Sequence, residues 1–271
     1  MLMKLSFSTL GCPQYTIDAI IEAAVANGYD GIELRAAENT VELWNVKGFT
    51  GAGLADTRQK LRDNGIAAVC VGSSASFCVA DAERRQAALD SAQKYIEIAQ
   101  GLDCPYIRTF GGPLPALQSY TESIKWSREG YELLCELAQK AGIIPLLETH
   151  DDFSTSARAL DILDGVEASN LGVVWDILHS YRYGERLDDS FKKLGRRIKH
   201  VHIKDSAEFS ATGFDLVLTG EGKVPIAECV NILRESGYDG YLSFEWEKMW
   251  HPEIQSPEVA IPHYARFMKA L

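Results

Sequence analysis

Four short apolar segments of the sequence each supply a residue that can bind a metal ion. They are IIPLLE, NLGVVWD, IKHVHIK and YLSFE, which contain Glu148, Asp176, His202 and Glu245. Three carboxylates and one imidazole make an oxygen-rich ligand set for a divalent cation. If the segments are strands of one barrel, their ends meet at the catalytic mouth. We therefore expect these four side chains to form one mononuclear metal site.

The period of a β-strand tests whether the four side chains can converge. Residues two apart in a strand share one face, so each ligand brings its alternate neighbours to the inside of the barrel. The pattern is compatible with an inward-facing set that holds the four ligands together with Ile144, Leu146, Gly172, Val174, His200, Lys204, Tyr241, Ser243 and Glu247. Each ligand taken alone could also be an ordinary polar residue at a strand end.

Strand-like and helix-like patterns alternate along the whole chain, which favours a parallel sheet with helical crossovers. Eight such pairs within 271 residues predict a single-domain (β/α)8 TIM barrel over residues 1–271. A doubly wound open sheet is the alternative, but no G-x-G-x-x-G follows the first strand. The expected strands are 5–10, 31–35, 66–72, 105–112, 143–148, 170–176, 197–205 and 241–247, and the expected helices are 17–28, 54–64, 81–100, 120–141, 155–164, 187–194, 225–236 and 258–270.

Composition narrows the class of protein. The net charge of −11 argues against a nucleic-acid partner, because nucleic-acid binders usually present a basic face. The six cysteines lack metal-binding spacing and read as reduced, buried thiols. The apolar run within residues 1–12 is too short for the core of a signal peptide, and no segment reaches the roughly 20 apolar residues that span a bilayer. We expect a cytoplasmic protein with no membrane partner; a homo-oligomer is left open.

Two long connections, 36–53 and 205–224, follow expected strands and would lie at the catalytic face. They are candidate lids, or alternatively plain surface insertions. The Gly220-Glu221-Gly222 turn could offer backbone N–H groups to a phosphate, although a lone G-x-G is weak evidence for a phosphorylated substrate.

Several segments together resemble the xylose isomerase-like barrel superfamily of sugar isomerases, epimerases and related lyases. The resemblance covers most of the chain and is strongest in NGYDGIEL (27–34), LLETH (146–150), WDILH (175–179), HVHIKD (200–205), GEGKVP (220–225) and GYDGYLSFEWE (237–247). It implies that Glu148, Asp176, His202 and Glu245 bind one Mn²⁺, Co²⁺ or Mg²⁺ ion, with Zn²⁺ as a further candidate. It also implies that Glu148 and Glu245 are the catalytic acid/base pair.

Four other residues are candidate substrate ligands. His179 lies three residues after Asp176, where the superfamily commonly has a histidine beside the substrate or metal. Lys204 could bind a substrate oxygen or pair with Glu245 or Glu247. Arg108 could clamp a substrate carboxylate or hydroxyl, or form a structural ion pair.

Residues around this set complete the expected mouth. Glu247 is predicted to bind substrate, although a structural role is as compatible with its position. Glu33 and His200 are expected to face inward, with His200 deeper and held by a hydrogen bond in the core. The mouth is expected to be bordered by His150, Trp250 and His251.

We therefore expect an isomerase or epimerase that acts on a keto sugar or sugar derivative through a metal-stabilised enediolate. The alternative is a lyase that dehydrates an inosose or 3-dehydroshikimate, and IRTFGG (107–112) resembles a segment of the latter enzymes. An endonuclease IV-like enzyme is disfavoured because DLVLT (215–219) lacks the histidine that its trinuclear zinc site needs. A non-catalytic sugar-binding barrel is the remaining alternative.

Overall fold

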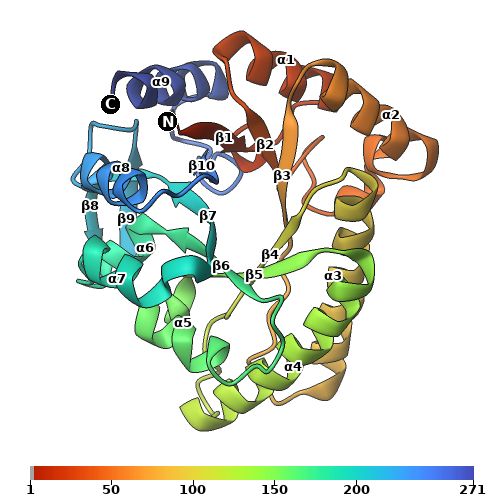
Figure 1. The fold of residues 1–271 in the computed structure, drawn as a ribbon, viewed down its shortest axis with the longest axis vertical. Helices are drawn as coiled ribbons and strands as arrows, with labels where there is room; N and C mark the ends of the chain where they lie inside the picture. Colours follow the sequence, from red (N-terminus) through yellow and green to blue (C-terminus); the bar gives the residue numbers. More distant parts are fainter. Residues whose placement is uncertain (1–2) are drawn as a thin grey trace.

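A closed barrel of eight parallel strands forms the centre of the protein, as a computed structural model shows (Figure 1). The structure describes residues 3–271, so the first two residues of the segment 1–12 lie outside this range. The barrel strands are β1 (Lys4–Ser8), β2 (Gly31–Leu34), β3 (Ala67–Gly72), β4 (Tyr106–Phe110), β5 (Ile144–Glu148), β6 (Gly172–Asp176), β7 (Ile198–Ile203) and β10 (Tyr241–Phe244).

The strands follow the chain around the barrel, and β1 closes the ring by pairing with both β2 and β10. Helices surround the strands in Figure 1. They are α1 (Ile17–Asn27), α2 (Gly51–Asp63), α3 (Ala82–Gly101), α4 (Tyr120–Ala141), α5 (Ser156–Leu163), α6 (Ile177–Arg182), α7 (Leu187–Leu194), α8 (Ile226–Glu235) and α9 (Pro257–Ala270). The predicted (β/α)8 barrel is confirmed.

Local sequence signals explain where the helices begin and end. Thr16 caps α1 by accepting a hydrogen bond from the Ala19 N–H, and Gly28 ends the helix at a φ of 65°. Positive φ favours glycine because it has no Cβ. Ser119 and Glu122 form a capping box at the start of α4, in which each side chain accepts from the other residue's backbone N–H.

The seam between the first and last strands is closed by aromatic packing beneath α9. Tyr264 of this helix stacks on Phe244 with ring centroids 4.7 Å apart, and its hydroxyl donates to the Leu242 carbonyl at 3.1 Å. Tyr29, which follows α1, donates to the Ile261 carbonyl at 2.7 Å. The two ends of the chain therefore lie close together at one side of the barrel in Figure 1.

Three features differ from the expected pattern. The connection predicted over 205–224 contains an antiparallel hairpin, β8 (Asp205–Ser210) and β9 (Gly213–Val217), which is separate from the barrel sheet. Helix α6, with only six residues, follows β6 and was not expected, because so short a helix carries no readable apolar period. The last barrel strand ends at Phe244 and not at residue 247.

The core is apolar and the cysteines belong to it. All six cysteines are buried and free, as expected. Among the described residues 3–271, no helix has the length and apolar character to cross a membrane.

Candidate metal centre at the barrel mouth

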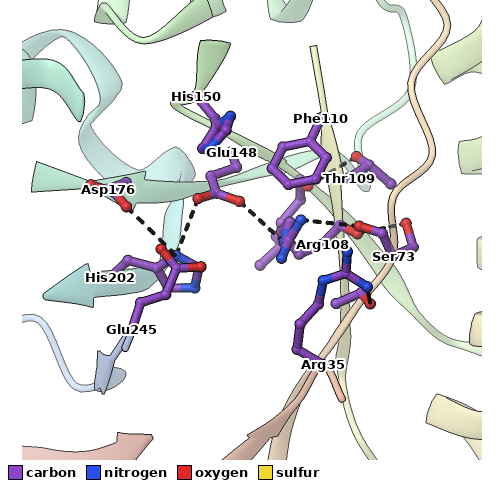
Figure 2. A network of polar contacts seen from close by, with 12 residues as sticks. Arg35, Ser73, Arg108, Thr109, Phe110, Glu148, His150, Asp176, His202 and Glu245 are labelled. Carbon is purple, nitrogen blue, oxygen red and sulfur yellow. Dashed lines mark hydrogen bonds and ion pairs between the residues drawn. The ribbon is translucent and has the colours of Figure 1, made fainter. Parts of the chain in front are cut away.

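The four predicted ligands come together at the carboxyl ends of β5, β6, β7 and β10 (Figure 2). One ligand atom from each of Glu148, Asp176, His202 and Glu245 lies within 4.8 Å of the others. The His202 Nδ1 atom is 3.2 Å from Glu148 Oε1, 3.4 Å from Glu245 Oε2 and 3.9 Å from Asp176 Oδ2. The side chains are almost fully buried. Buried carboxylates gathered around one point repel one another unless a cation lies among them.

Backbone and side-chain contacts hold the Asp176 carboxylate in position. Asp176 caps α6, since its Oδ1 accepts from the His179 N–H at 3.0 Å. Its other oxygen, Oδ2, is buried and has no aligned hydrogen bond, although the Lys204 ammonium lies 3.0 Å away. Thr149 joins β5 to β6 because its hydroxyl oxygen accepts from the Asp176 N–H at 2.9 Å. The short helix therefore fixes Asp176 so that one oxygen remains directed into the cluster, where it can accept a cation.

Two buried cations already contact the cluster. Arg108 Nε lies 3.1 Å from Glu148 Oε2. Lys204 Nζ lies 2.6 Å from Glu245 Oε2, 2.7 Å from Glu247 Oε1 and 3.0 Å from Asp176 Oδ2. The geometry therefore allows both a structural ion pair and a substrate contact for Arg108 and Lys204, because each pairs with a carboxylate and each also lies at the mouth.

These charges shift the pKa values of the cluster in opposite directions. Burial raises the pKa of Asp176 to about 6; the Lys204 charge opposes this rise, and the nearby Glu245 and Glu148 carboxylates add to it. Burial also acts to raise the pKa of Glu245, but the Lys204 and His202 charges hold it well below its usual value. The pKa of Glu148 is lowered in the same way, against burial, by Arg108 and His202.

The imidazole of His202 lies between Glu33 on one side and the Glu148 and Glu245 carboxylates on the other. Burial opposes its protonation, but Glu33, Glu245 and Glu148 raise its pKa well above the usual value. The same contact lowers the pKa of Glu33, because the His202 charge and hydrogen bonds from both histidines outweigh burial. His200 is indeed deep in the core, with Nε2 2.8 Å from Glu33 Oε2, as expected from the sequence.

The remaining predicted residues border the same cluster. His179 Nε2 is 3.1 Å from Lys204 Nζ, and burial with the Lys204 charge holds the pKa of His179 well below its usual value. Glu247 is 9% exposed and accepts from Lys204. His251 Nε2 is 3.7 Å from Glu247 Oε2, whereas Trp250 is exposed.

Aromatic rings and two further arginines, not singled out from the sequence, frame the mouth. Phe214 of β9 lies edge-on to His179, with ring centroids 5.5 Å apart. Arg182 of α6 donates from Nη1 to the hairpin carbonyls of Ser210 and Ala211, at 3.1 Å each. These contacts place the hairpin against the site, and the mixed polar pattern of residues 205–217 gave little sign of it.

The third arginine at the mouth, Arg35, lies beside Arg108 in Figure 2. It is 4% exposed and donates to Ser74 Oγ at 2.7 Å and the Gly72 carbonyl at 3.4 Å. Within residues 3–271, no carboxylate lies within the 4.0 Å of an ion pair with Arg35. Burial and the Arg108 charge lower its pKa to about 10. Its alternation with Glu33 along β2 was the signal that could have found it.

The Gly220-Glu221-Gly222 turn has its backbone donors satisfied within the chain. The N–H groups of Gly220 and Gly222 donate to Asp205 Oδ2 at 2.8 and 3.0 Å, and that of Val224 donates to Oδ1 at 3.1 Å. A Cβ on Gly222 would lie 2.2 Å from Asp205 Oδ1, so the turn requires glycine. The suggested phosphate contact is not supported, because these N–H groups already bind a carboxylate.

A closed parallel barrel with an acidic cluster at the carboxyl ends of its strands defines the class of (β/α)8 barrel proteins that carry their sites at this mouth. Residues 21–271 match the family model of the xylose isomerase-like TIM barrel, and the chain belongs to this family. The fold and the family expected from the sequence are thus confirmed.

Similar proteins include enzymes with different reactions. The chain is 27% identical over 263 residues to fructoselysine 3-epimerase of Shigella flexneri, covering 93% of this chain and 92% of the relative. It is 26% identical over 262 residues to 3-dehydroshikimate dehydratase of Bacillus anthracis, covering 90% and 91%. The crystal structure of the IOLI protein with a zinc atom has a TM-score of 0.81 at 20% identity, covering 99% and 97%.

Proposed function

We propose that this protein is a divalent-metal-dependent isomerase or epimerase that acts on a keto sugar or sugar derivative. The observation that carries the proposal is the convergence of four ligand atoms, three from carboxylates and one from an imidazole, within 4.8 Å at the barrel mouth. The family and the similarity to fructoselysine 3-epimerase support this class of reaction. The zinc atom in the IOLI protein supports the metal requirement.

The four side chains Glu148, Asp176, His202 and Glu245 would hold the cation. Such an ion would polarise a substrate carbonyl and stabilise the negative charge that develops when the neighbouring C–H bond is broken. Mn²⁺, Co²⁺ and Mg²⁺ suit an oxygen-rich ligand set, and Zn²⁺ also accepts an imidazole with carboxylates.

We assign the proton transfers to Glu148 and Glu245. The lowered pKa of each keeps both carboxylates ionised near neutral pH, which is the form that accepts a proton from carbon. One carboxylate removes the proton on one face of the substrate, the other takes a proton from solvent and returns it to the opposite face, and the first then releases its proton to solvent, so that both carboxylates are again ionised. The stereocentre is inverted and no atom is lost. Return at the neighbouring carbon would interconvert an aldose and a ketose.

The substrate contacts are assigned to the residues that border the cluster. The Lys204 ammonium and the neighbouring Glu247 carboxylate can donate to and accept from sugar hydroxyls. The depressed pKa of His179 keeps its imidazole neutral, so that the ring can exchange hydrogen bonds with a hydroxyl. Arg108 supplies a fixed cation on the other side of Glu148.

A lyase that dehydrates a cyclic keto-polyol is the second candidate, and one observation favours it. Arg35 is a buried guanidinium without a carboxylate partner among residues 3–271, beside Arg108. Such a pair suits a substrate that carries its own carboxylate, as dehydroshikimate does. The similarity to 3-dehydroshikimate dehydratase supports the same alternative. Here the proton is removed as before, but a hydroxyl group then leaves as water.

The deciding experiment follows substrates by NMR in heavy water. The metal-free protein is loaded with Mn²⁺, Co²⁺, Mg²⁺ or Zn²⁺, incubated with ketoses, inososes and 3-dehydroshikimate, and cleared of metal before spectra are recorded. Deuterium on a retained sugar carbon with inversion or carbonyl migration supports the isomerase or epimerase. Formation of an enone or aromatic product supports the lyase.

Variants test the assigned carboxylates. Glu148→Gln and Glu245→Gln should each lower exchange and turnover by at least about 100-fold, the usual size of a general acid/base contribution. Glu185→Gln is the matched control, because Glu185 is a largely buried carboxylate that accepts from the Ser156 N–H, away from the four ligands. Full activity in both site variants would contradict the assignment, and turnover unaffected by metal removal would contradict the metal requirement.

A further inference from the structure

Glu33 lies deep in the barrel, below the four proposed ligands, and takes no part in the chemistry assigned above. It projects inward from β2 and is fully buried. Its Oε2 atom lies 2.8 Å from His200 Nε2, 2.9 Å from His202 Nε2 and 2.8 Å from Ser243 Oγ. Three donors from β7 and β10 therefore converge on one oxygen of a residue from the opposite end of the sequence.

The two ring nitrogens of His202 face different groups. Nε2 faces Glu33, whereas Nδ1 faces Glu148 and Glu245, at 3.2 and 3.4 Å. An ionised carboxylate only accepts hydrogen bonds, so the Nε2 atom must carry the proton in this contact. In a neutral imidazole the proton on one nitrogen leaves the lone pair on the other. A metal ion among the carboxylates would take the place of the Nδ1 proton, so that Nδ1 would present its lone pair to the cation while Nε2 keeps its proton toward Glu33.

We propose that Glu33 is a positioning residue that fixes the orientation and tautomer of His202, so that Nδ1 is available to the metal ion. The inference rests on the proposed metal centre and extends it by one layer of residues. A carboxylate that accepts from the far nitrogen of a metal-bound histidine strengthens binding, and losing such a partner typically costs 10- to 100-fold in metal affinity. His200 and Ser243 hold Glu33 itself in place.

The same three residues could instead form a second metal site, since Glu33, His200 and His202 also lie within ligand distance of one another. The contacts argue against this. A cation bound by all three residues would have to replace the hydrogen bonds that the Nε2 atoms of His200 and His202 now make with Glu33. The distances of 2.8–2.9 Å are those of complete hydrogen bonds.

The test measures metal affinity of the full chain by calorimetry with Mn²⁺ and Zn²⁺. Glu33→Gln keeps the shape of the side chain and should weaken binding by about 10- to 100-fold. Glu185→Gln is the matched control, because it makes the same change at a largely buried carboxylate away from His202, and its loss of affinity should stay well below tenfold. Equal metal affinity in Glu33→Gln and the unmodified protein would overturn the role of Glu33 and leave the proposed function unaffected.

A spectroscopic readout separates positioning from a general structural role. In the zinc-loaded protein, ¹⁵N NMR of the His202 ring should show a proton on Nε2 and none on Nδ1, and Glu33→Gln should broaden or shift that pattern. The spectrum of the unmodified protein decides the matter even if the variant fails to fold, since an unprotonated Nε2 would overturn the inference. Two ions bound per chain would overturn it in favour of a second site. Failure of the unmodified protein to bind any of these ions would overturn the proposed function together with it.

Discussion

Lys204 Nζ lies 2.6 Å from Glu245 Oε2, so a proposed metal ligand is also paired with an internal ammonium group. The same nitrogen is 3.0 Å from Asp176 Oδ2, and both partners are buried. Although burial disfavours its charge, these carboxylates raise the pKa of Lys204 well above its usual value. The lysine therefore supplies positive charge at the same oxygens that a metal ion would use.

Lys204→Met should destabilise the metal-free protein strongly, because it leaves buried carboxylates without their cation. Breaking a buried pair costs about 3–5 kcal/mol. Thermal unfolding in EDTA is the measurement, and added Mn²⁺ should recover more stability in the variant than in the unmodified protein. Lys60→Met is the control, since Lys60 pairs with Asp18 at the surface and its loss should matter little. Equal unfolding temperatures for the Lys204 variant and the unmodified protein would argue against this role.

Metal addition itself should stabilise the unmodified protein. A ligand that binds only the folded state at 100 times its dissociation constant adds about 2.7 kcal/mol by mass action. Unfolding followed across a series of Mn²⁺ or Zn²⁺ concentrations should show this rise. Asp176→Asn should reduce it, because Asp176 Oδ2 is a carboxylate oxygen directed into the cluster and a proposed ligand atom. Asp188→Asn, on the surface of α7, should leave it intact.

Arg182→Leu should loosen the β8–β9 hairpin without unfolding the barrel. Arg182 donates to the hairpin carbonyls of Ser210 and Ala211, so its loss removes the contacts that hold the hairpin tip against α6. Amide hydrogen exchange measured by mass spectrometry should accelerate in peptides over 205–217 and stay unchanged in the barrel strands. Arg186→Leu, which removes an exposed arginine of the same region, should produce no such change. Exchange that accelerates equally everywhere would count against a local anchor.

The six cysteines should resist alkylation in the folded protein. Burial raises the pKa of every one of these thiols, to about 12 for Cys104 and Cys135. Only the thiolate reacts, so a raised pKa depletes the reactive form. Iodoacetamide labelling of the folded chain should therefore stay low as the pH rises through 8.5, the usual thiol pKa, whereas the chain in guanidinium should label fully. Rapid labelling of the folded protein would contradict the burial.

Ser119→Ala should destabilise the protein by about 1 kcal/mol at neutral pH, because it removes the cap of α4. Hydrogen bonds from Ser119 lower the pKa of Glu122, so the contribution of this carboxylate is present above its unfolded pKa and is lost as the pH falls through its folded value. The difference between variant and unmodified protein in urea unfolding should therefore shrink under acidic conditions. A difference that grows in acid would exclude the capping box as its source.

The convergence of the ligands was readable from the sequence because two regular periods determine it. Alternation along each strand assigns Glu148 and His202 to the inner face, and the βα repeat brings successive strand ends to one mouth. For Glu245 the prediction holds although the residue lies outside the strand. It lies one residue beyond β10, yet its N–H still donates to the Ile203 carbonyl at 3.1 Å and so keeps the strand direction.

The contacts around the ligands were not readable, since they depend on tertiary packing. Asp176 is both a proposed ligand and the cap of α6, and a six-residue helix is too short to show an apolar period in the sequence. Arg35 has the same alternation as Glu33, but its lack of a carboxylate partner among residues 3–271 is visible only in three dimensions. The alternatives left open for Lys204 and Arg108 persist because each residue reaches a carboxylate and the mouth at once.

Asp205 ties the two ends of the 205–224 connection together at its base. Its carboxylate accepts N–H groups from both ends of the 205–224 excursion, including Ser206 at 2.8 Å and Val224 at 3.1 Å. An excursion tied at its own base can change in length and sequence at its tip without disturbing the register of β7 and β10, because longer loops add little closure entropy. Substrate selectivity can therefore change within residues 205–224 while Glu148 and Glu245, the proposed proton-transfer residues, keep their positions.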